Sequence, residues 1–167
     1  MRKKSQIGQV FIYLISTLII IHVHYYGYNA IKGISQKQKE LTFVKFQNAL
    51  RDMVSYTSSD YGTVRIEEFY LPSGYKEVCF VDVDFNQDNL DEGLISEQDY
   101  PLIYDSVYES INESRKISTN VFVLPDGSPF FIEKMHVYNG FNCTKVSQGK
   151  IKLRIEGKGD SALVMQP

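Results

Sequence analysis

The sequence predicts an α+β fold. A long N-terminal hydrophobic helix continues as an amphipathic helix and leads into an antiparallel, sandwich-like β-rich head with one inserted helix. Three patterns predict this: an apolar block near the start, apolar residues at helical spacing after it, and β-type runs beyond residue 62. We therefore divide the chain into a basic leader, 1–8, a transmembrane and stalk helix, 9–58, and a head, 59–167.

The apolar block has the length and composition of a membrane span. Between residues 7 and 31, tyrosines aside, the only side chains that can carry a charge are His22 and His24. A helix from Lys4 to His22 rises about 27 Å, close to the bilayer hydrocarbon thickness of about 30 Å. Three tyrosines follow as an aromatic belt: Tyr25, Tyr26 and Tyr28. Since positions i and i+2 face different sides of a helix, haem or metal ligation by the two histidines is disfavoured.

Charge is unevenly distributed along the chain. The formal net charge is −2, but residues 2–4 carry +3 and residues 32–58 carry another +3, which leaves −8 on the head. An acidic head repels phosphate backbones, so we expect no nucleic-acid partner. Basic residues flank the apolar block on both sides. The short basic tail is typical of a signal n-region, which stays cytoplasmic while the longer C-terminal part is exported.

The start of the chain carries a resemblance to a known family. The run Arg2-Lys3-Lys4-Ser5-Gln6-Ile7-Gly8-Gln9-Val10-Phe11 resembles the class III signal peptides of archaeal type IV pilins and pilin-like proteins. In that family a short basic leader ends in a small residue before glutamine. Two registers fit: Ser5 before Gln6, and Gly8 before Gln9.

The resemblance implies a function and partners. A prepilin-type peptidase would remove the leader and leave the apolar helix as a membrane anchor that later becomes a filament core. The protein would then be a structural subunit of a surface filament that self-associates through this helix. It would be a single-pass membrane protein with an extracytoplasmic head, at the cell surface if assembled. The alternative is a membrane-tethered binding module that forms no filament.

We expect neither an enzyme nor a cofactor. The sequence contains no P-loop, G-x-S-x-G or H-E-x-x-H motif. His136 is the lone histidine of the head and has no nucleophile partner evident in the sequence.

The stalk and the head have different periodicities. Apolar residues at spacings of three and four give the stalk one apolar face: Phe43, Phe46, Leu50 and Met53 or Val54. Head strands are expected near 63–71, 76–85, 120–124, 130–138, 141–146, 150–156 and 161–165. Between the second and third, the capping-box pattern Ser96–Asp99 predicts a helix with Pro101 in its first turn. Its apolar side holds Ile103, Val107 and Ile111.

Two cysteines occur, Cys79 and Cys143, without the spacing of a zinc site. Either they are buried free thiols or they form a disulfide in an oxidising compartment. We predict that they pair after export, from neighbouring strands, with Cα atoms within about 7 Å of each other.

Three further patterns have two interpretations each. Asp82, Asp84, Asn86 and Asp88 alternate as in a calcium loop, but Gln87 replaces the required glycine and Gly93 the required glutamate. We therefore predict no tight calcium site, and hence no metal. Lys150, Lys152 and Arg154 alternate with apolar residues as a ligand-binding stripe or, more commonly, a solvated strand face. Asn112 and Asn142 begin N-glycosylation sequons, which matter only for an exported head.

Overall fold

The computed structural model describes residues 3–113 and 117–167, and one helix, α1 (Lys3–Ser58), makes up the first third of it. It runs for 56 residues without a proline. The chain divides into two compact units, the first ending at Leu41 and the second running from Thr42 to Pro167. Residues 42–58 of α1 therefore belong to the same compact unit as the strands.

Seven strands form two sheets in the second unit. The four-stranded sheet has the order β1-β6-β7-β4, and the three-stranded sheet the order β3-β2-β5. Their bounds are β1 (Val64–Tyr70), β2 (Glu77–Val81), β3 (Val121–Leu124), β4 (Met135–Val137), β5 (Phe141–Lys145), β6 (Lys150–Gly157) and β7 (Ala162–Met165). All pairings are antiparallel except β4 with β7, which is parallel, so the β-rich head is mixed at that edge.

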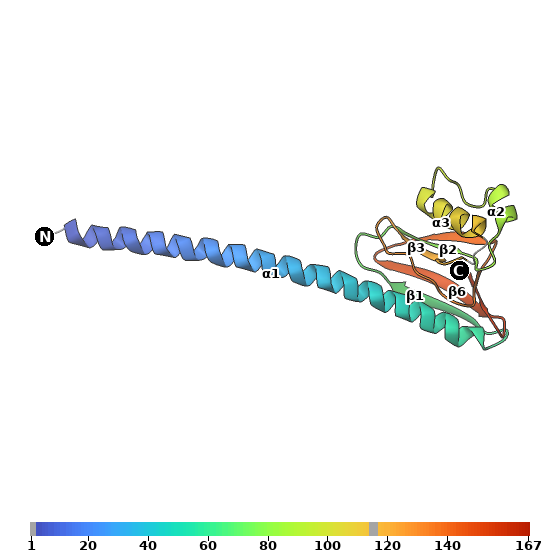
Figure 1. The fold of residues 1–167 in the computed structure, drawn as a ribbon. Coiled ribbons are helices and arrows are strands. Elements are labelled where there is room, and N and C mark those ends of the chain that lie inside the picture. Colours follow the sequence, from blue (N-terminus) through green and yellow to red (C-terminus); the bar gives the residue numbers. More distant parts are fainter. Residues whose placement is uncertain (1–2, 114–116) are drawn as a thin grey trace. The chain divides into compact units, whose positions relative to one another are not determined.

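The two sheets and the second half of α1 enclose one apolar core (Figure 1). Alternation in β6 turns Ile151, Leu153 and Ile155 into this core and leaves the residues between them on the outer face. From α1, buried side chains at helical spacing join the same core: Phe46, Leu50 and Val54. The apolar face predicted for the stalk helix is therefore buried inside the head.

Close approach between α1 and β6 requires a glycine. A Cβ atom on Gly157 would collide with the backbone oxygens of Thr57 and Asp60. The Gly157 N–H donates to the Thr63 carbonyl at 2.8 Å, and the Gly157 carbonyl accepts from Gly62 at 2.9 Å. The end of the helix is thus tied to the end of β6.

A second apolar core lies on the other face of the three-stranded sheet. Cys79 and Val81 of β2 pack there against Ile103 and Val107 of α3 (Pro101–Asn112). The short helix α2 (Gln87–Asp91) contributes Leu90. The order of layers is therefore four-stranded sheet, first core, three-stranded sheet, second core and helices α2 and α3, with α3 beyond β2 and β3 in Figure 1.

Three local expectations need correction. The second strand ends at Val81, because Asp82 turns the chain toward α2, which was not expected. The predicted strand 130–138 is reduced to β4 and an isolated bridge at Phe130, since Lys134 adopts a positive φ of 58° between them. The Ser96 hydroxyl accepts from the Asp99 N–H at 3.3 Å in a turn before α3, which begins at Pro101 after Tyr100.

A buried amide fixes the segment that leads into β4. Asn120 is fully buried, and its side chain donates to the Ile132 carbonyl at 2.9 Å and accepts from the Ile132 N–H at 2.8 Å. Both backbone groups of Ile132 are satisfied in this way without a continuous strand.

Candidate functional site

The first half of α1 has an apolar surface that the described chain does not bury. Every side chain described from Val10 to Ile34 is exposed, and the large apolar ones are between 47% and 70% exposed. By length and composition this part of α1 can cross a membrane. Such a surface in contact with water is unfavourable by about 25 cal/mol per Å² of apolar area.

The two histidines at the end of the apolar block do not form a shared site. His22 Nδ1 lies 3.0 Å from the Leu18 carbonyl oxygen, and His24 Nδ1 lies 2.9 Å from that of Ile20. Each ring therefore bonds to its own helix four residues back.

The expected leader residues lie in this helix. Ser5, Gln6, Gly8 and Gln9 are all within the backbone of α1, and their side chains lie outside the part described. The two registers for processing thus stay open.

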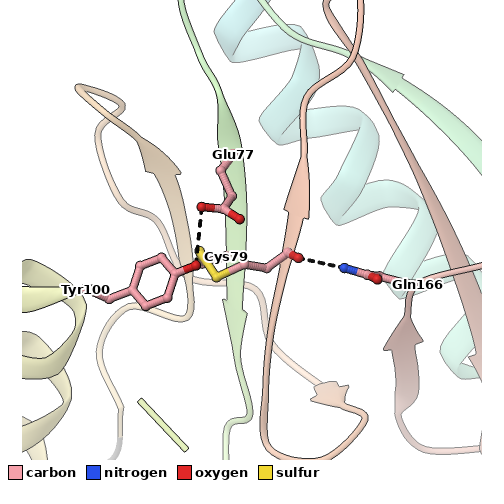
Figure 2. Close-up of a disulfide and its surroundings, with 5 residues drawn as sticks. Glu77, Cys79, Tyr100 and Gln166 are labelled. Carbon is pink, nitrogen blue, oxygen red and sulfur yellow. Dashed lines mark hydrogen bonds between the residues drawn. A yellow bond between two sulfur atoms is a disulfide. The ribbon is translucent and has the colours of Figure 1, made fainter. Parts of the chain in front are cut away.

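Cys79 and Cys143 form a disulfide between neighbouring strands, which confirms the predicted pairing (Figure 2). They are register partners on β2 and β5, with Cα atoms 4.0 Å apart. Cys79 is fully buried and Cys143 half-buried. The bond ties the edge strand β5 to the central strand of its sheet.

Polar contacts surround the disulfide (Figure 2). Gln166 Nε2 donates to the Cys143 carbonyl at 2.6 Å, which satisfies an acceptor on the edge strand. The Tyr100 hydroxyl donates to Glu77 Oε2 at 3.4 Å. Burial, and then the Glu77 carboxylate, raise the pKa of Tyr100, so the hydroxyl keeps its proton and remains a donor.

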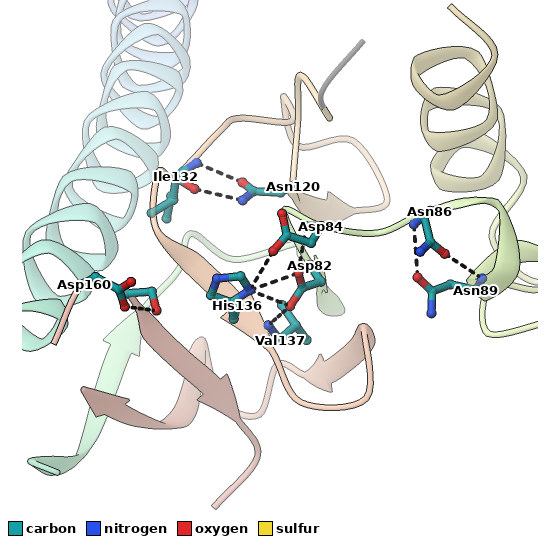
Figure 3. A network of polar contacts seen from close by, with 10 residues as sticks. Asp82, Asp84, Asn86, Asn89, Asn120, Ile132, His136, Val137 and Asp160 are labelled. Atoms are coloured by element: carbon teal, nitrogen blue, oxygen red, sulfur yellow. Dashed lines mark hydrogen bonds and ion pairs between the residues drawn. The ribbon is translucent and has the colours of Figure 1, made fainter. Parts of the chain in front are cut away.

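Asp82 links the two sheets rather than opening a calcium loop (Figure 3). Its Oδ2 accepts from the Val137 N–H at 2.7 Å, and its Oδ1 accepts from the Asp84 N–H at 2.8 Å. His136 Nδ1 lies 3.1 Å from the same Oδ1. The Asp82 side chain is 13% exposed, whereas that of Asp84 is 83% exposed. This carboxylate thus joins the end of β2 to β4.

The other residues of the alternating run have different roles. Asn86 is the N-cap of α2: its side chain accepts from the Asn89 N–H at 3.2 Å, and Asn89 Oδ1 accepts from the Asn86 N–H at 3.0 Å. Asp88 lies in the first turn of α2. The side chains of this run therefore do not converge on a single ion position. The absence of a tight calcium site stays a prediction, which calorimetry can test.

Two groups in the described chain bring three potential metal ligands together. Asp82, Asp84 and His136 have ligand atoms within 4.8 Å of one another, and so do Glu77, Cys79 and Cys143. In the second group both sulfurs are committed to the disulfide. In the first, the Asp82 oxygens already accept two backbone N–H groups. Sequence reasoning missed the pairing of Asp82 with His136, because 54 residues separate them and no local pattern connects them.

The basic stripe of β6 is engaged in ion pairs on the outer face of the four-stranded sheet. Glu68 of β1 lies 3.0 Å from Lys152 Nζ and 3.4 Å from Lys150 Nζ. The hydrogen bond from Lys152, and then its charge, lower the pKa of Glu68. Glu156 lies 2.6 Å from Lys158 Nζ, and this hydrogen bond lowers the pKa of Glu156. The stripe is thus a solvated, partly neutralised face.

A hollow of about 780 Å³ opens beside this stripe, where β5 meets β6. Most of its lining residues are polar, among them Thr144 and Lys145 of β5, Lys150 and Lys152 of β6, Glu68 and Gln166. Thr144 Oγ1 is buried and has no hydrogen-bond partner among the described residues. The hollow is therefore the best candidate for a ligand site on the head.

The two sequons lie in different surroundings. Asn112 is exposed at the last residue of α3, and the serine of its sequon lies outside the described residues. Asn142 is half-buried in β5, opposite Phe80. Asn112 is thus the more accessible of the two.

Comparisons with protein families, curated proteins and solved structures find no match for this chain.

Proposed function

We propose that this protein is a structural subunit of a type IV pilus-like surface filament, anchored first in a membrane by the first half of α1. The same half-helix then packs against copies of itself in the filament core. A prepilin-type peptidase removes the leader before assembly, and the head remains outside the cytoplasm. The proposal rests on the architecture and on the leader pattern at the start of the chain.

One observation carries the proposal: every described side chain from Val10 to Ile34 is exposed on an unbroken helix. An amphipathic surface helix has one apolar stripe, whereas this segment is apolar around its circumference. Such a segment needs apolar neighbours on all sides, which lipid supplies in a membrane and identical helices supply in a filament core.

The head supports an extracytoplasmic location. Disulfides persist in oxidising compartments, and Cys79–Cys143 crosslinks a three-stranded sheet of this unit. The head also has two apolar cores of its own, so it does not depend on the membrane segment for its fold. A stable head on an exposed apolar helix is what a filament subunit requires.

A second candidate is a membrane-tethered binding module. The hollow at Lys145, Lys150 and Lys152, with the buried Thr144 hydroxyl in its wall, favours it. Both candidates use the membrane segment, but only the first requires contacts between copies.

The first experiment determines the mature N-terminus of the full chain, expressed beside a prepilin-type peptidase and extracted from membranes. A start at Gln6 or Gln9 supports the filament subunit. An intact leader supports the tethered module, and a start near Ile31 contradicts both. Gly8→Leu and Ser5→Leu form a matched pair: only the variant at the processed register blocks cleavage.

The second experiment shears intact cells and examines the released material by electron microscopy. Fibres that contain this protein, and that disappear in the uncleaved variant, support the proposal. Protein that is processed correctly but stays dispersed in the membrane would overturn it in favour of the tethered module.

A further inference from the structure

One segment of the head carries charge of a single sign. Residues 82–113 contain ten acidic residues and not one lysine, arginine or histidine. The acidic residues are Asp82, Asp84, Asp88, Asp91, Glu92, Glu97, Asp99, Asp105, Glu109 and Glu113. Arg115 and Lys116, which follow the segment, lie outside the described residues.

The helical part of this segment, α2 and α3, forms one outer layer of the head. Its apolar side chains pack into the second core, so α3 turns its other side to solvent. That side combines Asp105 and Glu109, both exposed, with Leu102 at 69% and Tyr108 at 46% exposure. We call these four residues the acidic face of α3. It combines apolar groups with carboxylates, so it can contribute both buried apolar area and charge to a contact.

The outer face of the four-stranded sheet has the complementary composition. On β1 it exposes Val64, Ile66 and Tyr70, which are 46%, 60% and 60% exposed. Ile66 is the register partner of Arg154, and Tyr70 is that of Lys150. The row on and just after β6 carries Lys150, Lys152, Arg154 and Lys158 against the carboxylates of Glu68 and Glu156. We call this surface the basic sheet face; its net charge is positive.

The two faces lie at opposite ends of the stack of layers. The four-stranded sheet faces the first core with its inner side, and α3 faces the second core across the three-stranded sheet. Among the described residues, no ion pair joins the two faces within one head. Two different, complementary patches on one subunit make a head-to-tail contact, which builds an open filament unless the rotation between copies closes a ring.

We propose that the acidic face of α3 in one copy docks on the basic sheet face of the next copy. This inference rests on the proposed function in one respect: the filament or membrane holds the copies at high local concentration, where a modest contact is sufficient. Charge complementarity fixes which faces meet, and the exposed Leu102, Tyr108, Ile66 and Tyr70 supply the apolar part. The partner is thus a second copy of this chain.

Zero-length carbodiimide crosslinking of the full-length protein in its membrane tests the contact. This reagent condenses a carboxylate with an amine and joins only groups in contact. We expect dimers whose crosslinked peptides connect Asp105 or Glu109 with Lys150 or Lys152. Dimers linked only through other peptides, or no dimers at all, would overturn the proposal.

Charge reversal gives the decisive form of the test. An acid-reversed chain, with Asp105→Lys and Glu109→Lys, has two positive faces and is expected to lose these dimers by about tenfold or more. A base-reversed chain, with Lys152→Glu and Arg154→Glu, has two negative faces and loses them too. Mixing the two chains restores dimers, because each reversed face then meets an opposite charge. A misfolded variant could not be rescued in this way.

The matched control reverses two acidic residues away from both faces, Asp126→Lys and Glu133→Lys, and leaves the dimers unchanged. Failure of the mixed chains to recover, with the single variants folded, would overturn the head-to-tail contact. Fibres that form equally well with either reversed chain alone would reject this contact but leave the filament proposal intact. Specific dimers without any fibres would support this contact but reject the filament proposal.

Discussion

The two halves of α1 share one helical backbone but have different surroundings. From Val10 to Ile34 every described side chain is exposed, whereas Phe46, Leu50 and Val54 are 2%, 0% and 0% exposed. The second half presents apolar residues at spacings of three and four, and the head buries that stripe. The first half is apolar all round, and the described head offers it no core. The backbone conformation is thus the same throughout α1. The pattern of side chains decides whether a stretch of the helix packs against the head of its own chain or stays exposed to its surroundings.

The largest expected effect compares one residue type in both halves. Phe46→Ala removes a buried ring that packs edge-on against Phe69 and Phe130, with centroids 6.3 and 6.1 Å away. It should lower the free energy of unfolding of the head by about 3 to 5 kcal/mol. Phe11→Ala, at 65% exposure, should change it by less than about 0.5 kcal/mol. Urea unfolding of the full chain in detergent, followed by near-ultraviolet circular dichroism, measures both.

Membrane extraction provides the opposite readout for the same pair of positions. Replacing Phe11 with arginine should weaken retention in alkaline-washed membranes, because a charge inside a span is costly. Phe46→Ala should leave retention unchanged. If the Phe46 variant lost membrane retention while its head stayed folded, the assignment of retention to the first half of α1 and of head stability to the second half would be wrong.

The second effect concerns the contribution of the disulfide to the stability of the head. Replacing both cysteines, with Cys79→Ala and Cys143→Ala, removes a crosslink over a sequence separation of 64 residues. The expected loss is about 2 to 4 kcal/mol of head stability, with membrane retention unaffected. Reduction of the wild-type protein by dithiothreitol should produce the same shift in the urea midpoint. A midpoint insensitive to both treatments would show that the edge strand β5 needs no crosslink.

The third effect separates Asp82 from its neighbour Asp84. Asp82→Ala leaves the N–H groups of Val137 and Asp84 without their acceptor, and should cost the head about 1 to 3 kcal/mol. Asp84→Ala is the matched control, because that side chain is 83% exposed, and should cost less than about 0.5 kcal/mol. Thermal unfolding with and without millimolar calcium reads both. Stabilisation by calcium that depends on Asp84 would instead favour a metal role for this cluster.

Patterns within a few residues were sufficient to predict much of this architecture. Alternation in β6 gave its inner and outer faces, and the spacing of Phe46, Leu50 and Val54 gave the buried side of α1. The disulfide followed from compartment chemistry and from the expected neighbouring strands. For β6 and α1 the information is local, since periodicity reports which side of an element is buried.

What the sequence did not reveal depends on distant partners. The carboxylate of Asp82 accepts from Val137, 55 residues away, and no local pattern in its alternating run indicates that partner. The parallel pairing of β4 with β7 also has no local pattern. The acidic face of α3 does have a local pattern, because residues 82–113 lack any basic residue. Only the order of the layers shows that the basic sheet face belongs to a different layer of the head.

The smallest expected effect is on the outer face of the four-stranded sheet, which contributes charge rather than burial. Lys152, and then Lys150, hold the pKa of Glu68 below its ordinary value of 4.5. A carboxyl group whose pKa is lower in the folded than in the unfolded state stabilises the fold fully above the unfolded value. That contribution disappears as the pH falls through the folded value. Wild type should therefore melt at a slightly higher temperature than Glu68→Gln at pH 6, and the two melting temperatures should converge as the pH falls below the folded pKa of Glu68. Because the ion pairs are exposed, about 0.5 M salt should shrink the difference at pH 6 as well.

Glu67→Gln is the control: its side chain lies on the opposite face of β1, in register with buried Leu153 rather than with the lysines. A pH-dependent difference as large for Glu67→Gln as for Glu68→Gln would mean that general acidity of the strand, and not the Glu68 ion pairs, sets the acid response of the head.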